Sequence, residues 1–264
     1  MALDSHVTPL PPKGLFYDDM HVGLRFPSPS GVLLDAGLAS LYTALSGDGL
    51  ALTQDLELCR SVTGQDTLLV NPALVLHVSI GASTVATRNV IGNLFYRNVL
   101  LAQQVHQGIT LRTVTGVLAL ADSRPKPGSA PRGKALLGIQ TRTADGQIVV
   151  DYERCPLLPC KGEDAPGNTD EIGAAAPDLD LTHFTAAVPS NWQLGALGDH
   201  DEWAVGNVRS DYQRDMVDMA TALVRITHNQ AAVHRDVDAS SYPGRLVYGG
   251  HTVALAQASL NRVL

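Results

Sequence analysis

Side chains that can handle water at a reactive double bond gather near the C-terminal end of this 264-residue chain. Asn229, His234 and Asp236 fall within eight residues. An unperturbed imidazole titrates near neutral pH, so His234 can take a proton from water and return it. The Asn229 amide can orient that water but cannot take its proton, and Asp236 can hold the ring, contact a substrate or face solvent. The segment therefore predicts addition of water to an activated double bond, or removal of water to form one.

A Pro-Gly turn follows and leads into two consecutive glycines, Gly249 and Gly250, at the start of an apolar helix. The first N–H groups of a helix have no partner within the helix and attract negative charge. These two amides can therefore bind an oxygen on which charge develops during a reaction. Glycine also lets a substrate approach the backbone closely.

Each candidate also has a purely structural interpretation, which the sequence leaves open. A single histidine beside apolar Val233 can be a core residue with satisfied hydrogen bonds, and Asn229 can simply cap a turn. The other candidates are equally expected in solvated loops, helix caps, side-chain packing or helix starts: Asp236, Arg245, Tyr248, Gly249 and Gly250.

The composition is that of an ordinary globular chain and argues against several classes of partner. The chain is 45% hydrophobic and 17% charged, with a net charge of -7 and no basic cluster, which argues against nucleic acid. The N-terminal residues lack a signal-peptide pattern, and no apolar run approaches the ~20 residues that span a membrane. Cys59, Cys155 and Cys160 are odd in number and have neither redox nor zinc spacing. We expect a cytoplasmic protein with free thiols, no metal and no membrane partner.

The first half of the chain predicts an α+β fold. A strand and turn are expected over 16–26, a helix over 33–45, and a buried helix, apolar almost all round, that begins at Asn71-Pro72. Asp145-Gly146 predicts a hairpin turn. Four strands rich in Val, Leu, Ile and Thr are expected over 94–101, 110–120, 135–143 and 147–157. One buried helix wrapped by a curled antiparallel sheet is the hotdog arrangement.

The second half repeats the beginning of this order. A linker is expected over 161–183, and then a strand over 203–208, a helix over 211–225 and an apolar helix over 251–264. No sheet follows, although a lone helix cannot bury its apolar face. We therefore expect a double hotdog whose second unit is truncated after its central helix, either in a fragment or with another chain completing it. The expected units are an N-terminal domain over 14–160, the linker, and a C-terminal domain over 184–264.

Several segments resemble the MaoC-like hotdog hydratases, in particular the two-domain mesaconyl-CoA hydratase (beta-methylmalyl-CoA dehydratase) branch. The resemblance covers nearly the whole chain. Weaker support comes from 41–47, 74–81 and 92–94. Its most specific segments are Asn229-x-x-Ala232-Val233-His234-x-Asp236 and Gly244-Arg245-Leu246-Val247-Tyr248-Gly249-Gly250-His251.

This resemblance implies a double hotdog that binds an acyl-CoA or acyl-ACP thioester and reversibly hydrates its 2-enoyl double bond, without a metal or redox cofactor. His234 and Asn229 would handle the water, and Gly249 and Gly250 would bind the oxyanion. A double hotdog forms its own pseudo-dimer, so the chain is expected to be a monomer or a homodimer. Further contacts to the acyl group or coenzyme A would come from Tyr248, Arg245 and Asp236.

The chain departs from the broader family's motif, Asp-x-Asn-Pro-x-His. His234 matches the final His, but Asn229 stands in place of the Asp and Ala231 in place of the Asn. In the first unit Asp48 occupies the corresponding turn, with Thr53 where the His would fall. The chain is similar to the mesaconyl branch in having Asn at the first position. We expect an enoyl-CoA hydratase or dehydratase; the alternatives are a non-catalytic double hotdog that binds acyl-CoA or acyl-ACP, and a hotdog thioesterase.

Overall fold

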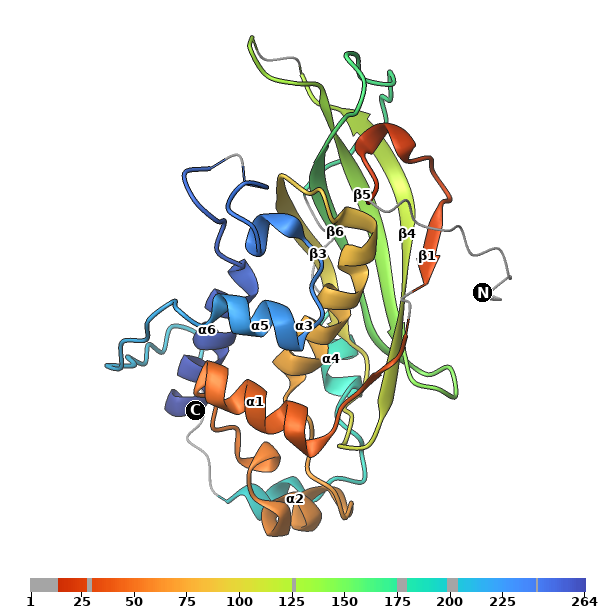
Figure 1. The fold of residues 1–264 in the computed structure, drawn as a ribbon. Coiled ribbons are helices and arrows are strands. Elements are labelled where there is room, and N and C mark those ends of the chain that lie inside the picture. Colours follow the sequence, from red (N-terminus) through yellow and green to blue (C-terminus); the bar gives the residue numbers. More distant parts are fainter. Residues whose placement is uncertain (1–13, 28–29, 125–126, 175–179, 199–203, 241) are drawn as a thin grey trace.

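The fold has two layers, a twisted antiparallel sheet and a group of helices packed against one of its faces (Figure 1). The computed structural model describes residues 14–27, 30–124, 127–174, 180–198, 204–240 and 242–264. No helix of this described part is long and apolar enough to cross a membrane.

The strands of the sheet follow the order β1-β4-β5-β6-β3, and the short β2 pairs separately with β4. Neighbouring strands are antiparallel, with Thr115 of β4 opposite Ile139 of β5. The four longest strands confirm the predicted ones, and each end lies within three residues of the expected position. The hairpin turn at Asp145-Gly146 is confirmed as well. The strand bounds are β1 Arg25–Pro27, β2 Val32–Leu33, β3 Gly92–Leu101, β4 Thr110–Asp122, β5 Arg132–Arg142 and β6 Ile148–Pro159.

Helix α3 (Pro72–Ser83) packs against β4, β5 and β6. It begins where the Asn71 side-chain oxygen accepts a hydrogen bond from the Ala73 N–H at 2.9 Å, and proline takes the first helical position. Leu74 and Val78 are buried, as are most of its residues, because the sheet covers one side and C-terminal elements contact the other. The predicted buried helix is confirmed.

Two other helices belong to the N-terminal half. In α1 (Ala36–Ser46) the Asp35 carboxylate accepts a hydrogen bond from the Leu38 N–H at 2.8 Å, and the helix ends at Gly47, whose φ of 67° favours glycine. This helix confirms the one predicted over 33–45, although it begins later. Helix α2 (Leu56–Thr63) follows it.

The predicted linker over 161–183 lies partly against the sheet. Thr169 forms an isolated β-bridge with Ala121, and the Asp170 carboxylate accepts a hydrogen bond from the Leu120 N–H at 2.8 Å. A short helix, α4 (Thr182–Ala186), comes next. The first part of this segment therefore extends the pairing at the edge of β4, and the domain limits stay a prediction.

The C-terminal half packs onto the N-terminal half through α5 (Ala220–Ile226) and α6 (Gly249–Val263) (Figure 1). Both helices contact α1, and α6 also contacts α3. A Cβ atom added to Gly81 of α3 would lie 1.8 Å from the Thr227 carbonyl oxygen, so the two backbones are in close contact. Side chains from both halves form one hydrophobic core, to which the C-terminal half contributes Leu223, Val224, Val233 and Ala254.

The apolar helix predicted over 251–264 is confirmed as α6, but two other predictions for this half are wrong. No strand forms over 204–208, and Trp203 lies outside the described residues. Of the helix predicted over 211–225, only the last part forms, as α5 (Ala220–Ile226). The described part of 184–264 contains no β-strand.

The missing helical turns at 211–219 have a physical cause. The Asp211 carboxylate accepts a hydrogen bond from the Gln213 N–H at 3.0 Å, a local turn that competes with helical hydrogen bonding. Asp211 and Asp215 also form ion pairs with Arg262 of α6, at 2.7 and 3.0 Å. These tertiary contacts hold the segment against α6 in a non-helical conformation.

Candidate active site

The segment that follows α5 is fixed to the end of α3 by hydrogen bonds. The Gln230 N–H donates to the Thr84 hydroxyl at 2.7 Å, and the Ala232 N–H donates to the Arg88 carbonyl at 2.9 Å. The Arg88 side chain returns a hydrogen bond to the Gln230 side-chain oxygen at 2.7 Å. Residues far apart in the sequence are thereby held together, and the position of the predicted Asn229 and His234 depends on this docking.

Asn229 is buried in the turn after α5. Its backbone N–H donates to the Val224 carbonyl at 3.0 Å, and its side-chain oxygen accepts a hydrogen bond from the Ala231 N–H at 2.9 Å. The capping role that the sequence left open is thus present. Because the cap uses the oxygen, the side-chain amide is left as a donor, and a hydrogen bond between it and the Tyr248 side chain lowers the pKa of Tyr248. The second amide hydrogen can donate to a bound water.

His234 is held in one tautomer. Its Nδ1 lies 3.0 Å from the Leu246 carbonyl oxygen, which can only accept a hydrogen bond. Nδ1 therefore carries the proton, and the unprotonated Nε2 can accept one. Burial lowers the pKa of His234 and the nearby charge of Arg245 lowers it further, although the hydrogen bond to Leu246 acts in the opposite direction. The imidazole is consequently neutral at pH 7 and suited to act as a base.

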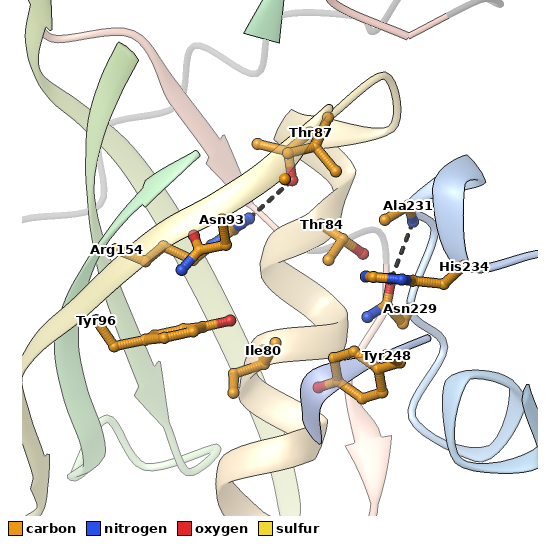
Figure 2. Close-up of a pocket in the computed structure, with 12 residues that line it drawn as sticks. Ile80, Thr84, Thr87, Asn93, Tyr96, Arg154, Asn229, Ala231, His234 and Tyr248 are labelled. Carbon is orange, nitrogen blue, oxygen red and sulfur yellow. Dashed lines mark hydrogen bonds between the residues drawn. The ribbon is translucent and has the colours of Figure 1, made fainter. Parts of the chain in front are cut away.

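A small polar cavity of about 30 Å³ lies between this segment and the sheet. Figure 2 shows Asn229, His234 and Tyr248 on one side, Arg154, Asn93 and Tyr96 on the other, and Ile80 and Thr84 of the α3 region between them. A cavity of this size has room for about two water molecules. Its lining can hydrogen-bond them, and it includes both residues predicted to handle water.

A larger cavity of about 480 Å³ adjoins the small one and has mostly apolar walls. This volume lies in the range of small-molecule sites. Its walls include Leu76, Leu94, Phe95, Val99 and Val253. The two cavities share the residues Ile80, Asn93, Tyr96, His234 and Tyr248. An apolar chain in the larger cavity would therefore end beside a polar group or water in the smaller one.

The start of α6 contributes to the larger cavity through Gly249 and Gly250. The His251 N–H donates to the Tyr248 carbonyl at 3.0 Å, but neither glycine N–H donates to a described residue. The two N–H groups can therefore donate to a ligand, although the Tyr248 ring fills the space beside the Gly250 Cα. The oxyanion contact stays a prediction. The Tyr248 side chain is buried, and burial raises its pKa, although a side-chain hydrogen bond with Asn229 acts in the opposite direction. The hydroxyl therefore stays protonated and can donate.

Two predicted substrate contacts do not line either cavity. Asp236 is exposed, and its carboxylate accepts a hydrogen bond from the Asp238 N–H at 3.0 Å, which caps a turn. Its contact with substrate stays a prediction. The Arg245 guanidinium donates to the His234 carbonyl at 3.2 Å. Arg245 acts on His234 through its charge and this contact rather than as part of a cavity wall.

The sequence did not identify the sheet-side residues of the site. Asn93 and Tyr96 lie on β3, and Arg154 lies on β6. Each belongs to a predicted strand, and nothing in the local pattern tells which strand faces the segment around His234. One signal was available: of the three charged residues over 148–159, Arg154 alternates in step with the apolar Val150 and Tyr152, so it falls on their face of the strand.

The corresponding turn of the N-terminal half has a structural role. Asp48 is buried and accepts hydrogen bonds from the side chains of Asn71 and Asn261 at 2.8 and 2.7 Å. Thr53, at the position of the motif's histidine, donates to the Leu50 carbonyl at 2.7 Å. No described base adjoins Asp48, so this turn ties α6 to the N-terminal half and has no arrangement for handling water.

Comparisons with known proteins agree with this architecture, although no family model matches the chain. The beta-methylmalyl-CoA dehydratase of Chloroflexus aurantiacus and the mesaconyl-CoA hydratase of Cereibacter sphaeroides are each 24% identical over 257 residues, which span 72% of each relative. A MaoC domain dehydratase from Chloroflexus aurantiacus superposes with a TM-score of 0.77 at 23% identity, over 96% of this chain and 75% of that one.

The Mycobacterium tuberculosis protein RV0216, which is described as having a double hotdog fold, is 36% identical. The match covers 95% of this chain and 77% of RV0216, with a TM-score of 0.81. The chain belongs to the MaoC-like double-hotdog family of hydratases and dehydratases. The predicted family and the predicted α+β hotdog class are therefore confirmed.

Proposed function

We propose that this MaoC-like double-hotdog protein is a hydro-lyase that reversibly adds water across the double bond of a 2-enoyl-CoA thioester. The observation that carries this proposal is the pair of adjoining cavities. One is polar, has room for water and contains Asn229 and the free Nε2 of His234. The other is apolar, accommodates an acyl chain and ends at the free amides of Gly249 and Gly250. Hydration of an enoyl thioester needs these elements together.

In the proposed reaction the Asn229 amide donates a hydrogen bond to the water, and His234 Nε2 takes a proton from it. The water oxygen forms a bond to C3, and the electron pair of the double bond moves toward C2 and the thioester oxygen. The Gly249 and Gly250 amides stabilise the charge on that oxygen. The imidazolium then returns its proton to C2, so water is added and the base is regenerated. Dehydration follows the same steps in reverse.

A mesaconyl-like acyl group is the finer form of this proposal. The names of the two curated relatives support it, since one is a mesaconyl-CoA hydratase and the other a beta-methylmalyl-CoA dehydratase. The proposal needs the acyl-CoA or acyl-ACP thioester as substrate and no separate cofactor. We further propose a cytoplasmic protein, consistent with three buried cysteines that are all free, and a monomer or homodimer.

A non-catalytic double hotdog that binds acyl thioesters is the second candidate. It is favoured by the amide of Asn229 in place of a family carboxylate, which leaves His234 as the only group near the small cavity's water that exchanges protons close to neutral pH. Such a protein would bind coenzyme A esters tightly without turning them over.

Loss of enoyl-thioester absorbance with crotonyl-CoA and mesaconyl-CoA tests the first proposal. We expect turnover by the unaltered chain and a fall of about 100-fold to 10,000-fold in His234→Ala, the usual contribution of general acid–base catalysis. His106→Ala is the matched control, because His106 Nδ1 also lies 2.8 Å from a carbonyl, that of Thr67, but the residue lines neither cavity. Full activity in a folded His234→Ala protein would refute the proposal, and binding of both esters without turnover would select the second candidate.

A further inference from the structure

Arg154 is a buried charge that has no acidic partner among the residues that the structure describes. It lies on β6 with 3% of its surface exposed. Both of its hydrogen bonds to described residues come from Nη2, which donates to the Ser83 carbonyl at 3.1 Å and to the Thr87 hydroxyl at 2.8 Å. The buried Nε has no partner among the described residues. A guanidinium in such a position is costly to the fold unless something else pairs with it.

The neighbouring charges on the strand do not provide that partner. Glu153, the preceding residue on β6, points to the other face and pairs with Arg97 of β3. No ion pair joins Arg154 to a carboxylate in the described part of the chain. The Ser83 carbonyl belongs to the last turn of α3 and offers only a partial negative charge.

The guanidinium faces the small polar cavity. Figure 2 shows Arg154 beside Asn93 and Thr87, across the cavity from His234 and Asn229. Among the residues that line this cavity, Arg154 is the only one that carries a full charge at neutral pH, since His234 is neutral there. The cavity therefore presents one uncompensated positive charge next to the group that would handle water.

We infer that Arg154 binds a carboxylate carried by the acyl group, and that the protein thereby selects 2-enoyl thioesters with a free carboxylate close to the double bond over purely hydrocarbon ones. This inference rests on the proposed function and adds a specificity-determining residue to it. The planar guanidinium fork matches a carboxylate, and the unused Nε is a free donor. The small cavity shares Asn93, Tyr96 and His234 with the larger apolar one, so a polar group at the end of an acyl chain can be directed toward Arg154.

Binding of saturated thioesters tests this inference without requiring turnover. Succinyl-CoA and butyryl-CoA have four-carbon acyl groups that differ by a terminal carboxylate, and neither has a double bond to hydrate. By isothermal titration we expect succinyl-CoA to bind about 10-fold to 100-fold more tightly to the unaltered chain, the range of a hydrogen bond to a charged group. We expect Arg154→Met to lose this preference while it still binds butyryl-CoA. Equal affinities for the two esters in the unaltered chain would overturn the inference.

Further variants separate a direct contact from a structural effect. Arg154→Lys keeps the positive charge but loses the planar guanidinium fork, so we expect part of the preference for succinyl-CoA to remain. This variant serves in place of Arg154→Met if the methionine variant does not fold. Arg245→Met tests the rival guanidinium beside His234. Loss of the preference in Arg245→Met and its retention in Arg154→Met would also overturn the inference. If the preference is present but no enoyl ester is hydrated, Arg154 keeps its role and the proposed hydratase activity fails.

Discussion

The imidazole of His234 is held in one orientation by the segment around it. Its Nδ1–H donates a hydrogen bond to the Leu246 carbonyl at 3.0 Å, and the Leu246 N–H donates to the Val233 carbonyl at 3.0 Å. This pair of contacts fixes the ring and its tautomer together. The Asn229 oxygen likewise accepts a hydrogen bond from the Ala231 N–H, so the side-chain amide is the group of Asn229 that can donate.

The protonation of His234 predicts the pH dependence of hydration. Burial lowers its pKa below the ordinary 6.5, and the neutral form is the base. As pH falls, kcat/KM for crotonyl-CoA should therefore stay constant through neutral pH and decrease only below pH 6.5. Crotonyl-CoA is chosen because its acyl group does not titrate in this range. A pH–rate profile that begins to fall above pH 7 would contradict the assignment, and His106→Ala should leave the profile unchanged.

The two sides of the site were not equally predictable. Asn229, His234, Gly249 and Gly250 occur in short segments in which residue type and spacing already indicate chemistry. Arg154 reaches the same cavity only because β6 lies between β5 and β3 in the sheet. Strand order and register depend on contacts between distant residues, and no local pattern contains them.

At the scale of elements, the site depends on how closely the turn after α5 docks on α3. Gly81 permits this contact, because any side chain there would meet the Thr227 backbone. Hydrogen bonds from Gln230 to Thr84 and from Ala232 to Arg88 then continue the docking toward His234. The small residue in α3 therefore determines where the base lies.

Gly81→Ala should disturb both stability and activity. Its Cβ would lie 1.8 Å from the Thr227 carbonyl oxygen, so the turn that contains Asn229 must move. We expect a loss of about 1–3 kcal/mol in the free energy of unfolding, the usual cost of overpacking, together with a lower kcat. Gly249→Ala is the control for stability, because its added Cβ would meet no atom within 4 Å. Equal urea midpoints for the two variants would show that the close contact is absent in solution.

Local signals determined which elements could be predicted. The Asn71 cap with Pro72, the Asp145-Gly146 turn and the alternating strands act over a few residues, and they gave α3 and the four long strands. The helix prediction failed over 211–219 because the carboxylates of this segment pair with Arg262 of α6. These contacts join residues about 50 positions apart, and such tertiary contacts can override local propensity. A local helical pattern cannot compete with several such tertiary contacts.

At the scale of the whole molecule, the candidate active site lies between the two halves of the chain. The C-terminal half contributes Asn229, His234 and the start of α6, whereas the N-terminal half contributes α3, β3 and β6 as walls. Neither half encloses the cavities alone. Contacts between the halves that lie far from the cavities should therefore affect the site, because they set the position of α6.

The hydrogen bond between Asn261 and Asp48 tests this coupling. Asn261 lies near the C-terminal end of α6, and its side-chain amide donates at 2.7 Å to a carboxylate that is 1% exposed. We expect a double-mutant cycle of Asp48→Ala and Asn261→Ala, measured by urea unfolding, to give a coupling energy of about 1–2 kcal/mol.

A control cycle of Asp48→Ala with Thr252→Ala, which changes an exposed residue of α6, should give additive effects. Additive losses for Asp48 and Asn261 as well would mean that this contact does not hold α6 in solution. Because the Gly249 and Gly250 amides lie at the other end of the same helix, a true coupling should also raise KM for enoyl thioesters in each single variant. A loss of stability without any change in KM would restrict Asp48 to folding and separate the position of α6 from substrate binding.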